Sequence, residues 1–217
     1  MTAPALIVLA KEPVPGRVKT RLCPPCTTDE AASLAAAALA DTLAAVAATP
    51  ASRRVLVLDG HPGAWVPDGI EVLAQRGVGL AERLGAAFDD VGAPALLVGM
   101  DTPQLTPARL AAAADALARS DAVLGPSVDG GYWAIGLRRA DARVFDGVPM
   151  SVATTGAVQR ARLRTLGLRT TELGALRDVD RFGDALAVAA GLDGGRFRAV
   201  LGEVAARLRD ERDPVAA

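Results

Sequence analysis

The sequence is poor in histidine, cysteine, lysine and aromatic residues, and these shortages narrow the chemistry open to it. His61 is the only histidine, and Cys23 and Cys26 are the only cysteines, among 217 residues. A structural zinc site needs four ligands. A Ser-His-Asp hydrolase would depend on His61, which stands beside Pro62 and Gly63 in what we expect to be a loop. The sequence therefore favours neither kind of site.

The usual nucleotide-binding signatures are also missing. The chain contains no G-x-x-x-x-G-K-[ST] segment, which excludes a P-loop. The glycines at 77 and 79 lack the third glycine of a dinucleotide fingerprint and do not follow the first predicted strand. Cys23 and Cys26 form a C-x-x-C pair just before a predicted helix start, an arrangement that is possible for a redox pair. We expect two free thiols in a loop instead.

The composition is typical of a soluble protein whose helices are packed by small side chains. Hydrophobic residues, many of them alanine, make up 51% of the chain, and aromatic residues only 3%. The net charge of −1 gives no reason to expect a nucleic acid or a membrane as a partner. The N-terminus lacks the features of a signal peptide, and Asp41 and several prolines interrupt the longest uncharged stretches. We therefore expect a cytoplasmic protein with one domain over residues 1–217.

Strands and helices are predicted to alternate along most of the chain. Apolar runs predict strands at 5–10, 53–59, 70–74, 95–99, 121–126, 132–137 and 168–172. Helical patterns and caps predict helices at 27–48, 80–91, 106–118, 153–166, 182–190 and 196–209. This alternation predicts an α/β protein with a largely parallel sheet flanked by helices. The tight turn between the strands at 121–126 and 132–137 predicts a mixed sheet.

Both lysines of the chain lie in one loop, whereas arginine supplies the positive charge everywhere else. Lys11 and Lys19, together with Arg17 and Arg21, follow the first predicted strand. Lysine carries a compact ammonium group that suits phosphate, and ligands of open α/β sheets bind at the carboxyl ends of strands. The loop therefore predicts a phosphate site. The alternative is a solvated basic loop.

Three aspartates are candidate metal ligands. Asp101 directly follows the buried strand at 95–99, and a carboxylate there, close to a phosphate loop, suits Mg²⁺ or Mn²⁺. The alternative for Asp101 is a turn or cap role. Asp178 and Asp180 follow the last predicted strand at alternate positions, so only one of them should face the site. We choose Asp180 as the second ligand, with Asp178 in reserve; the alternative for both is capping of the next helix.

The segment Asp129-Gly130-Gly131-Tyr132 allows the backbone to adopt positive φ or to approach a ligand closely. Alone it is an ordinary hairpin turn. Combined with the other loops, it is a candidate contact for an acceptor substrate.

Several of these motifs resemble those of one protein family. KEPVPGRVKTRL at 11–22, the arginine-leucine pair at 83–84, GMDTP at 99–103, DGGY at 129–132 and RDVD at 177–180 occur in the order found in a family of proposed bacterial glycosyltransferases. Its members are also called radical-SAM/selenodomain-associated transferases. Parts of the first and fourth motifs are also similar to the guanylyltransferases that activate phospholactate or phosphoenolpyruvate. Val128 and Met150 depart from the family pattern on the presumed acceptor side.

The resemblance implies a single-domain GT-A fold, a three-layer α/β/α sandwich with a mostly parallel, mixed sheet. It implies a transferase that binds a nucleotide donor with a divalent metal, Mg²⁺ or Mn²⁺. The implied phosphate-binding residues are Lys11, Gly16, Arg17, Lys19, Arg21 and Arg83, and the implied metal ligands are Asp101, Asp180 and Asp178. Asp101 and Lys19 would be catalytic, and Asp129, Gly130, Gly131, Tyr132 and Ser151 would contact the acceptor.

Three functions are compatible with these residues. The first is a nucleotidyltransferase that joins NMP from an NTP to a small phosphate- or carboxylate-bearing acceptor, which the concentration of positive charge in the first loop favours slightly. The second is a glycosyltransferase that uses a nucleotide-diphosphate sugar. The third is a non-catalytic nucleotide-binding module.

Overall fold

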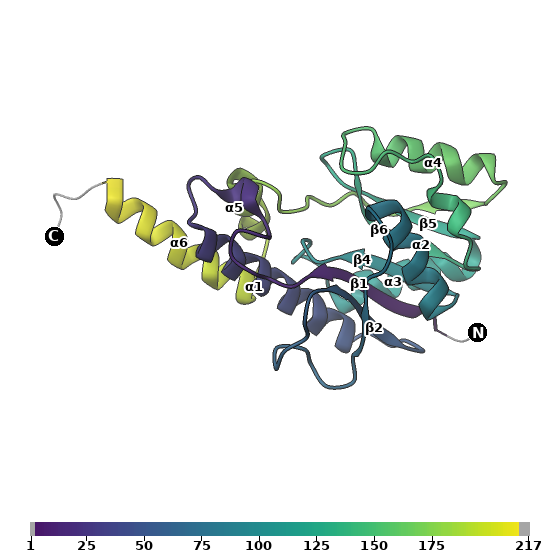
Figure 1. Cartoon of the computed structure of the whole chain (residues 1–217), viewed down its shortest axis with the longest axis horizontal. Helices are drawn as coiled ribbons and strands as arrows, with labels where there is room; N and C mark the ends of the chain where they lie inside the picture. The colour runs from purple at the N-terminus through teal and green to yellow at the C-terminus, as the bar shows by residue number, and fades with distance from the viewer. Residues whose placement is uncertain (1–2, 213–217) are drawn as a thin grey trace.

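A seven-stranded sheet lies at the centre of the computed structural model, which describes residues 3–212 (Figure 1). Its strands have the order β3-β2-β1-β4-β6-β5-β7. Strand β6 runs antiparallel to both of its neighbours, and all other neighbouring pairs are parallel. The predicted mostly parallel, mixed sheet is therefore confirmed. The strands are β1 (Ala5–Lys11), β2 (Arg54–Asp59), β3 (Glu71–Ala74), β4 (Ala95–Gly99), β5 (Ala122–Pro126), β6 (Tyr132–Leu137) and β7 (Thr170–Glu172).

Helices cover both faces of the sheet, which gives the expected three layers. The side chains of α1 and α3 pack on one face, and those of α2, α4 and η2 pack on the other. The 3-10 helices η1 and η2 are the two elements that the sequence patterns did not predict. The helices are η1 (Thr20–Leu22), α1 (Thr28–Ala47), α2 (Leu80–Val91), α3 (Pro107–Arg119), η2 (Ala142–Phe145), α4 (Thr155–Thr165), α5 (Phe182–Ala190) and α6 (Arg196–Arg212).

Strand β1 occupies a central position because it is apolar on both faces. Leu6 and Val8 belong to the cluster beneath α1 and α3, whereas Ile7 belongs to the cluster beneath α2. Successive side chains of a strand point to opposite faces, and a parallel strand buried on both sides has an uninterrupted apolar sequence. The carboxyl end of β1, where the first loop begins, therefore lies in the interior of the row formed by the strand ends.

Helices α5 and α6 pack against the first half of α1, away from most of the sheet (Figure 1). Phe197, which is fully buried, belongs to this contact. The predicted capping box begins α1: the Thr27 hydroxyl accepts a hydrogen bond from the Glu30 amide, and the Glu30 carboxylate accepts one from the Thr27 amide. Arg207 of α6 donates to the same Glu30 carboxylate at 2.7 Å, so this residue ties α6 to α1.

Cys23 and Cys26 lie beside this contact as free thiols, as predicted. Burial raises the pKa of the Cys26 thiol to about 11, which disfavours the reactive thiolate.

Helix α1 is the one helix of the described part that is long and apolar enough to cross a membrane, with 20 residues and a mean hydropathy of 1.4. Its most apolar window is 61% buried inside the protein. Eleven of its side chains, mostly alanine and leucine, are buried against the sheet, α3 and α6. Packing within the fold accounts for its apolar character.

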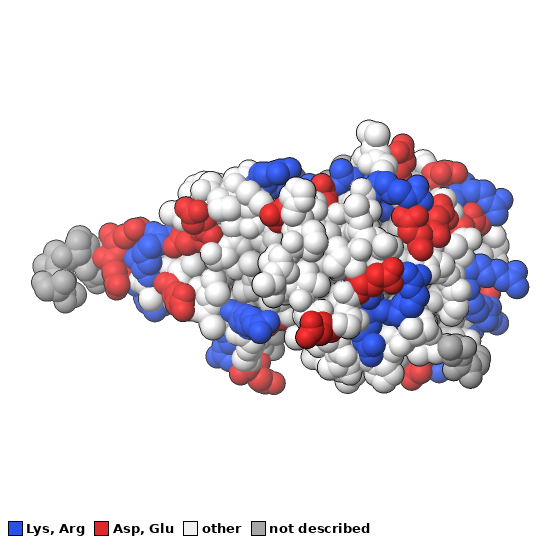
Figure 2. Space-filling model, turned by 60° about the horizontal axis from the view of Figure 1, so that its bottom comes forward, with Lys and Arg blue, Asp and Glu red and all other residues white. Residues whose placement is uncertain are grey.

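Acidic and basic side chains are intermixed on the face shown in Figure 2. Ion pairs among the described residues include Arg76 with Asp90 at 2.7 Å and Arg53 with Glu71 at 2.8 Å. Most such exposed pairs contribute little to stability.

Candidate functional site

A cleft of about 860 Å³ lies over the carboxyl ends of β1 and β4, where the first loop, β6 and the chain beyond β7 meet. The sequence-predicted residues that line it are Lys11, Arg17, Lys19, Arg21, Arg83, Asp101, Asp129, Gly131, Tyr132, Ser151, Asp178 and Asp180. Gly16 and Gly130 are not among the lining residues. The fold therefore brings together candidates from six separate parts of the sequence.

Lys19 joins three of these parts. Its Nζ lies 2.9 Å from Asp101 Oδ2 and also donates to the carbonyl oxygen of Val179. The Lys19 side chain is 13% exposed, against 34% for Asp101. Its backbone adopts the left-handed conformation, with φ 48°. The carboxylate of Asp101 thus pairs with Lys19 instead of stabilising a turn or capping a helix.

The segment after β7 passes the carboxyl ends of β5 and β4 and places both Asp178 and Asp180 in the cleft, so the prediction that only one of them would face the site is wrong. The Leu176 amide donates to the Pro126 carbonyl, and the Val179 amide donates to the Asp101 carbonyl at 3.0 Å. These long-range hydrogen bonds hold the segment beside the ends of β5 and β4. The Val179 side chain is buried, which fixes the backbone between Asp178 and Asp180.

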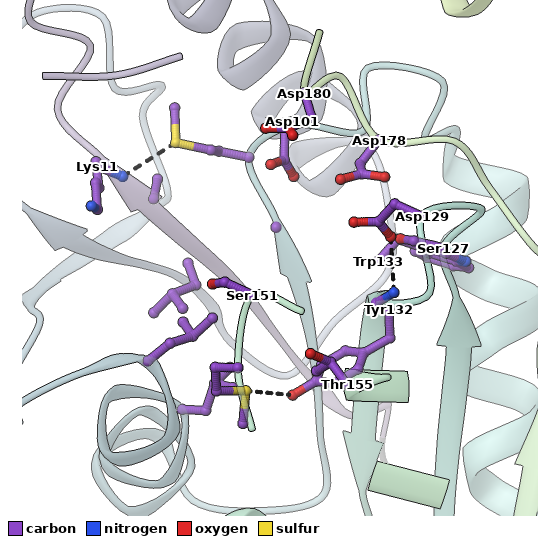
Figure 3. Close-up of a pocket in the computed structure, with 18 of the residues that line it drawn as sticks. Lys11, Asp101, Ser127, Asp129, Tyr132, Trp133, Ser151, Thr155, Asp178 and Asp180 are labelled. Atoms are coloured by element: carbon purple, nitrogen blue, oxygen red, sulfur yellow. Dashed lines mark hydrogen bonds between the residues drawn. The ribbon is translucent and has the colours of Figure 1, made fainter. Parts of the chain in front are cut away.

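Asp178 faces other carboxylates. Burial, together with the negative charges of Asp101 and Asp129, raises its pKa to about 6, while Lys19 opposes the shift. In the view of Figure 3, Asp101, Asp178 and Asp129 lie in a row, with Asp180 beside Asp101. The cleft therefore holds a concentration of negative charge that a cation would relieve.

Asp180 forms an ion pair with Arg21, with Arg21 Nη1 2.8 Å from Asp180 Oδ2. Neither Asp178 nor Asp180 caps α5: the N-cap is Arg181, whose amide donates to Asp184. The alternative role as helix caps is therefore wrong.

Arg83 is held firmly in the cleft wall. Its Nη1 lies 2.6 Å from Asp59 Oδ2 and 3.1 Å from Gln75 Oε1. Gln75 in turn donates from Nε2 to the carbonyl oxygens of Ala10 and Val57. The Arg83 guanidinium holds the pKa of the Asp59 carboxyl below its usual range, and Lys11 and Arg17 add to this effect from nearby.

Asp59 and Gln75 were not predicted as site residues. Both immediately follow or end a predicted strand, at 53–59 and 70–74, so the rule that selected Asp101 would have found them. They belong to the basic side of the cleft because they fix Arg83.

Gly130, one of the predicted acceptor contacts, lies outside the lining of the cleft. Its φ is +93°, and an added Cβ would lie 2.0 Å from the Ala153 carbonyl oxygen. Its carbonyl accepts from the Gly156 amide at 2.8 Å, while the Asp129 carboxylate accepts from the Gly131 amide at 2.8 Å. Gly130 therefore joins the hairpin to the start of α4, whereas Gly16, with φ +74° and open space around it, sits on the outer part of the first loop.

The remaining acceptor-side candidates are neutral. Ser151, with φ 61°, stands between Lys11 and Tyr132 in the view of Figure 3. Its loop is held by Thr155, whose hydroxyl donates to the Pro149 carbonyl at 2.8 Å. The Tyr132 hydroxyl lies 3.4 Å from Gln159 Oε1, and burial raises its pKa, which keeps it a neutral phenol.

The carboxylates of the cleft are suited to a divalent ion that arrives with a ligand. No group of three acidic, histidine or cysteine side chains in residues 3–212 converges as a complete metal site. Mg²⁺ characteristically binds one or two protein carboxylates and completes its shell with water and substrate phosphates. Asp101 and Asp178, whose charges repel each other, fit that partial donor set. Asp180 fits it less well because Arg21 already neutralises it.

A family model described as "Uncharacterized protein conserved in bacteria (DUF2064)" matches residues 33–152, which is 120 of the 217 residues. No curated protein matches the sequence significantly.

Solved structures with this fold include three informative ones. A protein from Desulfovibrio desulfuricans G20, provisionally described as a nucleotide-diphospho-sugar transferase, is 28% identical with a TM-score of 0.85; the match covers 97% of this chain and 98% of that one. Rv0371c from Mycobacterium tuberculosis H37Rv, in complex with manganese, is 21% identical with a TM-score of 0.52, covering 87% and 98%. The 2-C-methyl-D-erythritol 4-phosphate cytidylyltransferase of Thermus thermophilus is 16% identical with a TM-score of 0.52, covering 88% and 98%. The last two share the fold.

Proposed function

This chain belongs to the DUF2064 family, and from that premise we propose that it is a transferase that uses a nucleotide donor and a divalent metal ion. One observation carries the proposal: basic residues of the first loop and a group of carboxylates line one cleft, at the carboxyl ends of the strands, where α/β proteins bind ligands. The similarity to the Desulfovibrio protein over nearly the full length of both chains supports the transferase class.

Lys11, Arg17 and Arg83 would hold the nucleotide phosphates from the basic wall. Arg83 is preorganised for this by Asp59 and Gln75, so little order has to be gained on binding. Lys19 and Arg21 would turn from their carboxylates towards phosphate as the ligand arrives. Gly16 would let the outer loop approach the donor.

Asp101 and Asp178, with Asp180 beside them, would hold the metal ion. When bound, Mg²⁺ or Mn²⁺ would neutralise charge on the leaving phosphates. The protein's own part is positioning and electrostatic stabilisation, which dominate phosphoryl-type transfer. Lys19, which lies beside Asp101, would stabilise the leaving group once its ammonium turns from that carboxylate.

Nucleotidyl transfer is the first candidate reaction, because five cationic side chains line the cleft and suit the charge of a triphosphate. An acceptor oxygen would form a bond to the α-phosphorus while the bond to pyrophosphate breaks. The acceptor would lose its proton to water in the open cleft, and pyrophosphate would leave.

Glycosyl transfer is the second candidate, favoured by the Desulfovibrio relative. There the acceptor oxygen would bond to the sugar's anomeric carbon and lose its proton to water, while the bond from that carbon to the nucleoside diphosphate would break. The released product separates the two reactions: pyrophosphate in the first, a nucleoside diphosphate in the second.

The first experiment is a thermal-stability screen with NTPs and nucleotide sugars, each with and without Mg²⁺ or Mn²⁺. A ligand at about a hundred times its dissociation constant stabilises by about 2.7 kcal/mol, which is roughly 5 to 10 °C at this size. Asp101→Asn should abolish the metal-dependent part of the shift, and Asp193→Asn, on an exposed turn, is the matched control. A metal-dependent shift that survives in Asp101→Asn would contradict the assigned role. Silence across the whole panel would contradict the proposal.

A further inference from the structure

Charge is divided unevenly between the two sides of the cleft. Within residues 3–212, the lysines and arginines that line it are Lys11, Arg17, Lys19, Arg21 and Arg83, all from the first loop and α2. The opposite side, formed by the β5–β6 hairpin and the loop at 150–153, contributes neutral side chains and Asp129. An anion bound on that side would meet carboxylates without a local counter-charge.

The same side also has an apolar floor. Met150 and Tyr132 belong to this side and remain partly exposed. They pack against the core cluster that includes Leu84 of α2 and Leu97 of β4, both of which also line the cleft. Val152 is 48% exposed at the rim. A ligand here can bury carbon atoms against this surface, a contribution of about 25 cal/mol per Å² of apolar area.

One polar group on this side, the Tyr132 hydroxyl, lacks a close partner. The Tyr132 hydroxyl has only long contacts, 3.4 Å to Gln159 Oε1 and 3.9 Å to Met150 Sδ, whereas O–H···O hydrogen bonds cluster near 2.7–2.8 Å. Gln159 cannot easily move closer, because it is fully buried and donates to the Val144 carbonyl at 2.7 Å. A hydroxyl that is largely removed from water tends to find a partner, and a ligand in the cleft is well placed to supply one.

The adjacent carboxylate of Asp129 favours ligand groups that donate hydrogen bonds. Asp129 accepts from the Gly131 amide through Oδ1, and its ionised carboxylate has further accepting capacity. Ser151 and Tyr132 can both donate and accept. Hydroxyl groups match all three side chains, whereas a phosphate or carboxylate matches only the two hydroxyls and is repelled by Asp129.

We propose that the acceptor is a neutral polyhydroxy compound, such as a sugar or polyol, rather than the phosphate- or carboxylate-bearing molecule expected from the sequence. Its hydroxyls face Asp129, Tyr132 and Ser151, and its C–H face lies on Met150 and Val152. This inference rests on the proposed function, because it assigns the second substrate of the same cleft.

The test compares matched probes on the protein saturated with Mg²⁺ and the NTP or nucleotide sugar that stabilises it most in the thermal screen. Saturation-transfer NMR is recorded for glucose against glucose 6-phosphate and for glycerol against glycerol 3-phosphate. The neutral member of each pair should bind better. Tyr132→Phe should weaken it by about three- to tenfold, the effect of losing one hydrogen bond, with an unchanged melting temperature because the hydroxyl has no close protein partner. Val78→Ala, at a residue 87% exposed and outside the lining of the cleft, is the matched control.

The two proposals fail in different ways. Absence of donor binding in the same samples would overturn the proposed function. Donor binding together with stronger binding of the phosphorylated probes, with no binding of the neutral probes, or with neutral binding unaffected by Tyr132→Phe would overturn the acceptor assignment alone.

Discussion

Removing the Lys19 ammonium should lower stability and at the same time strengthen metal binding. Lys19→Met keeps an unbranched side chain of similar length but leaves Asp101 without its cation and the Val179 carbonyl without its donor. Hydrogen bonds to charged groups contribute about 1.5–3 kcal/mol, and exposed ion pairs about 0–1 kcal/mol. With Lys19 13% and Asp101 34% exposed, we expect a loss of about 1–3 kcal/mol.

This loss corresponds to a melting temperature about 3 to 10 °C lower for a chain of this size. Without the competing ammonium, Mn²⁺ alone should bind several-fold more tightly, while binding of the nucleotide should weaken. Calorimetric melting and electron paramagnetic resonance titration of free Mn²⁺ measure the two effects. Lys11→Met, at the exposed last residue of β1, is the matched control for stability and for binding of Mn²⁺ alone. Wild-type stability combined with unchanged or weaker Mn²⁺ binding in Lys19→Met would refute the reasoning.

Three further changes test other parts of the structure. Burial and neighbouring carboxylates raise the pKa of Asp178 from 3.8 to about 6, so the folded state binds the proton more tightly and stability should fall as pH rises from about 4 to 6. Asp178→Asn should flatten this pH dependence of the unfolding free energy, measured in urea, and an unchanged slope would contradict the prediction. Thr27→Ala should cost about 1 kcal/mol by removing the cap of α1, whereas Thr28→Ala should cost clearly less, and equal losses would argue against the cap. Gly130→Ala should be severely destabilising, since its Cβ would lie 2.0 Å from a carbonyl oxygen, whereas Gly174→Ala meets open space; similar melting temperatures would contradict the close packing.

Several features of the site followed from local patterns. The first loop, Asp101 and the turn at 129–131 all follow predicted strands, and the ends of parallel strands share one edge of a sheet. The single-domain assignment and the cytoplasmic location stay predictions. The sequence led us to expect a phosphate- or carboxylate-bearing acceptor, and we now propose a neutral polyhydroxy one. The number of cationic residues was known from the sequence, but the side of the cleft on which they lie was not.

The sequence by itself determined the fold class, the cap of α1 and the set of strand ends from which the cleft is built, because periodicity and capping depend on residues close together in the chain. Only the tertiary structure decided which side chains meet. Lys19 reaches Asp101 and Val179 across 82 and 160 residues, and Arg83 reaches Asp59 across 24. Asp178 turns towards Asp101 and Asp129 because the segment after β7 is fixed across the sheet edge by long-range hydrogen bonds. Such contacts depend on strand order and on the path of that segment, and no local pattern encodes either.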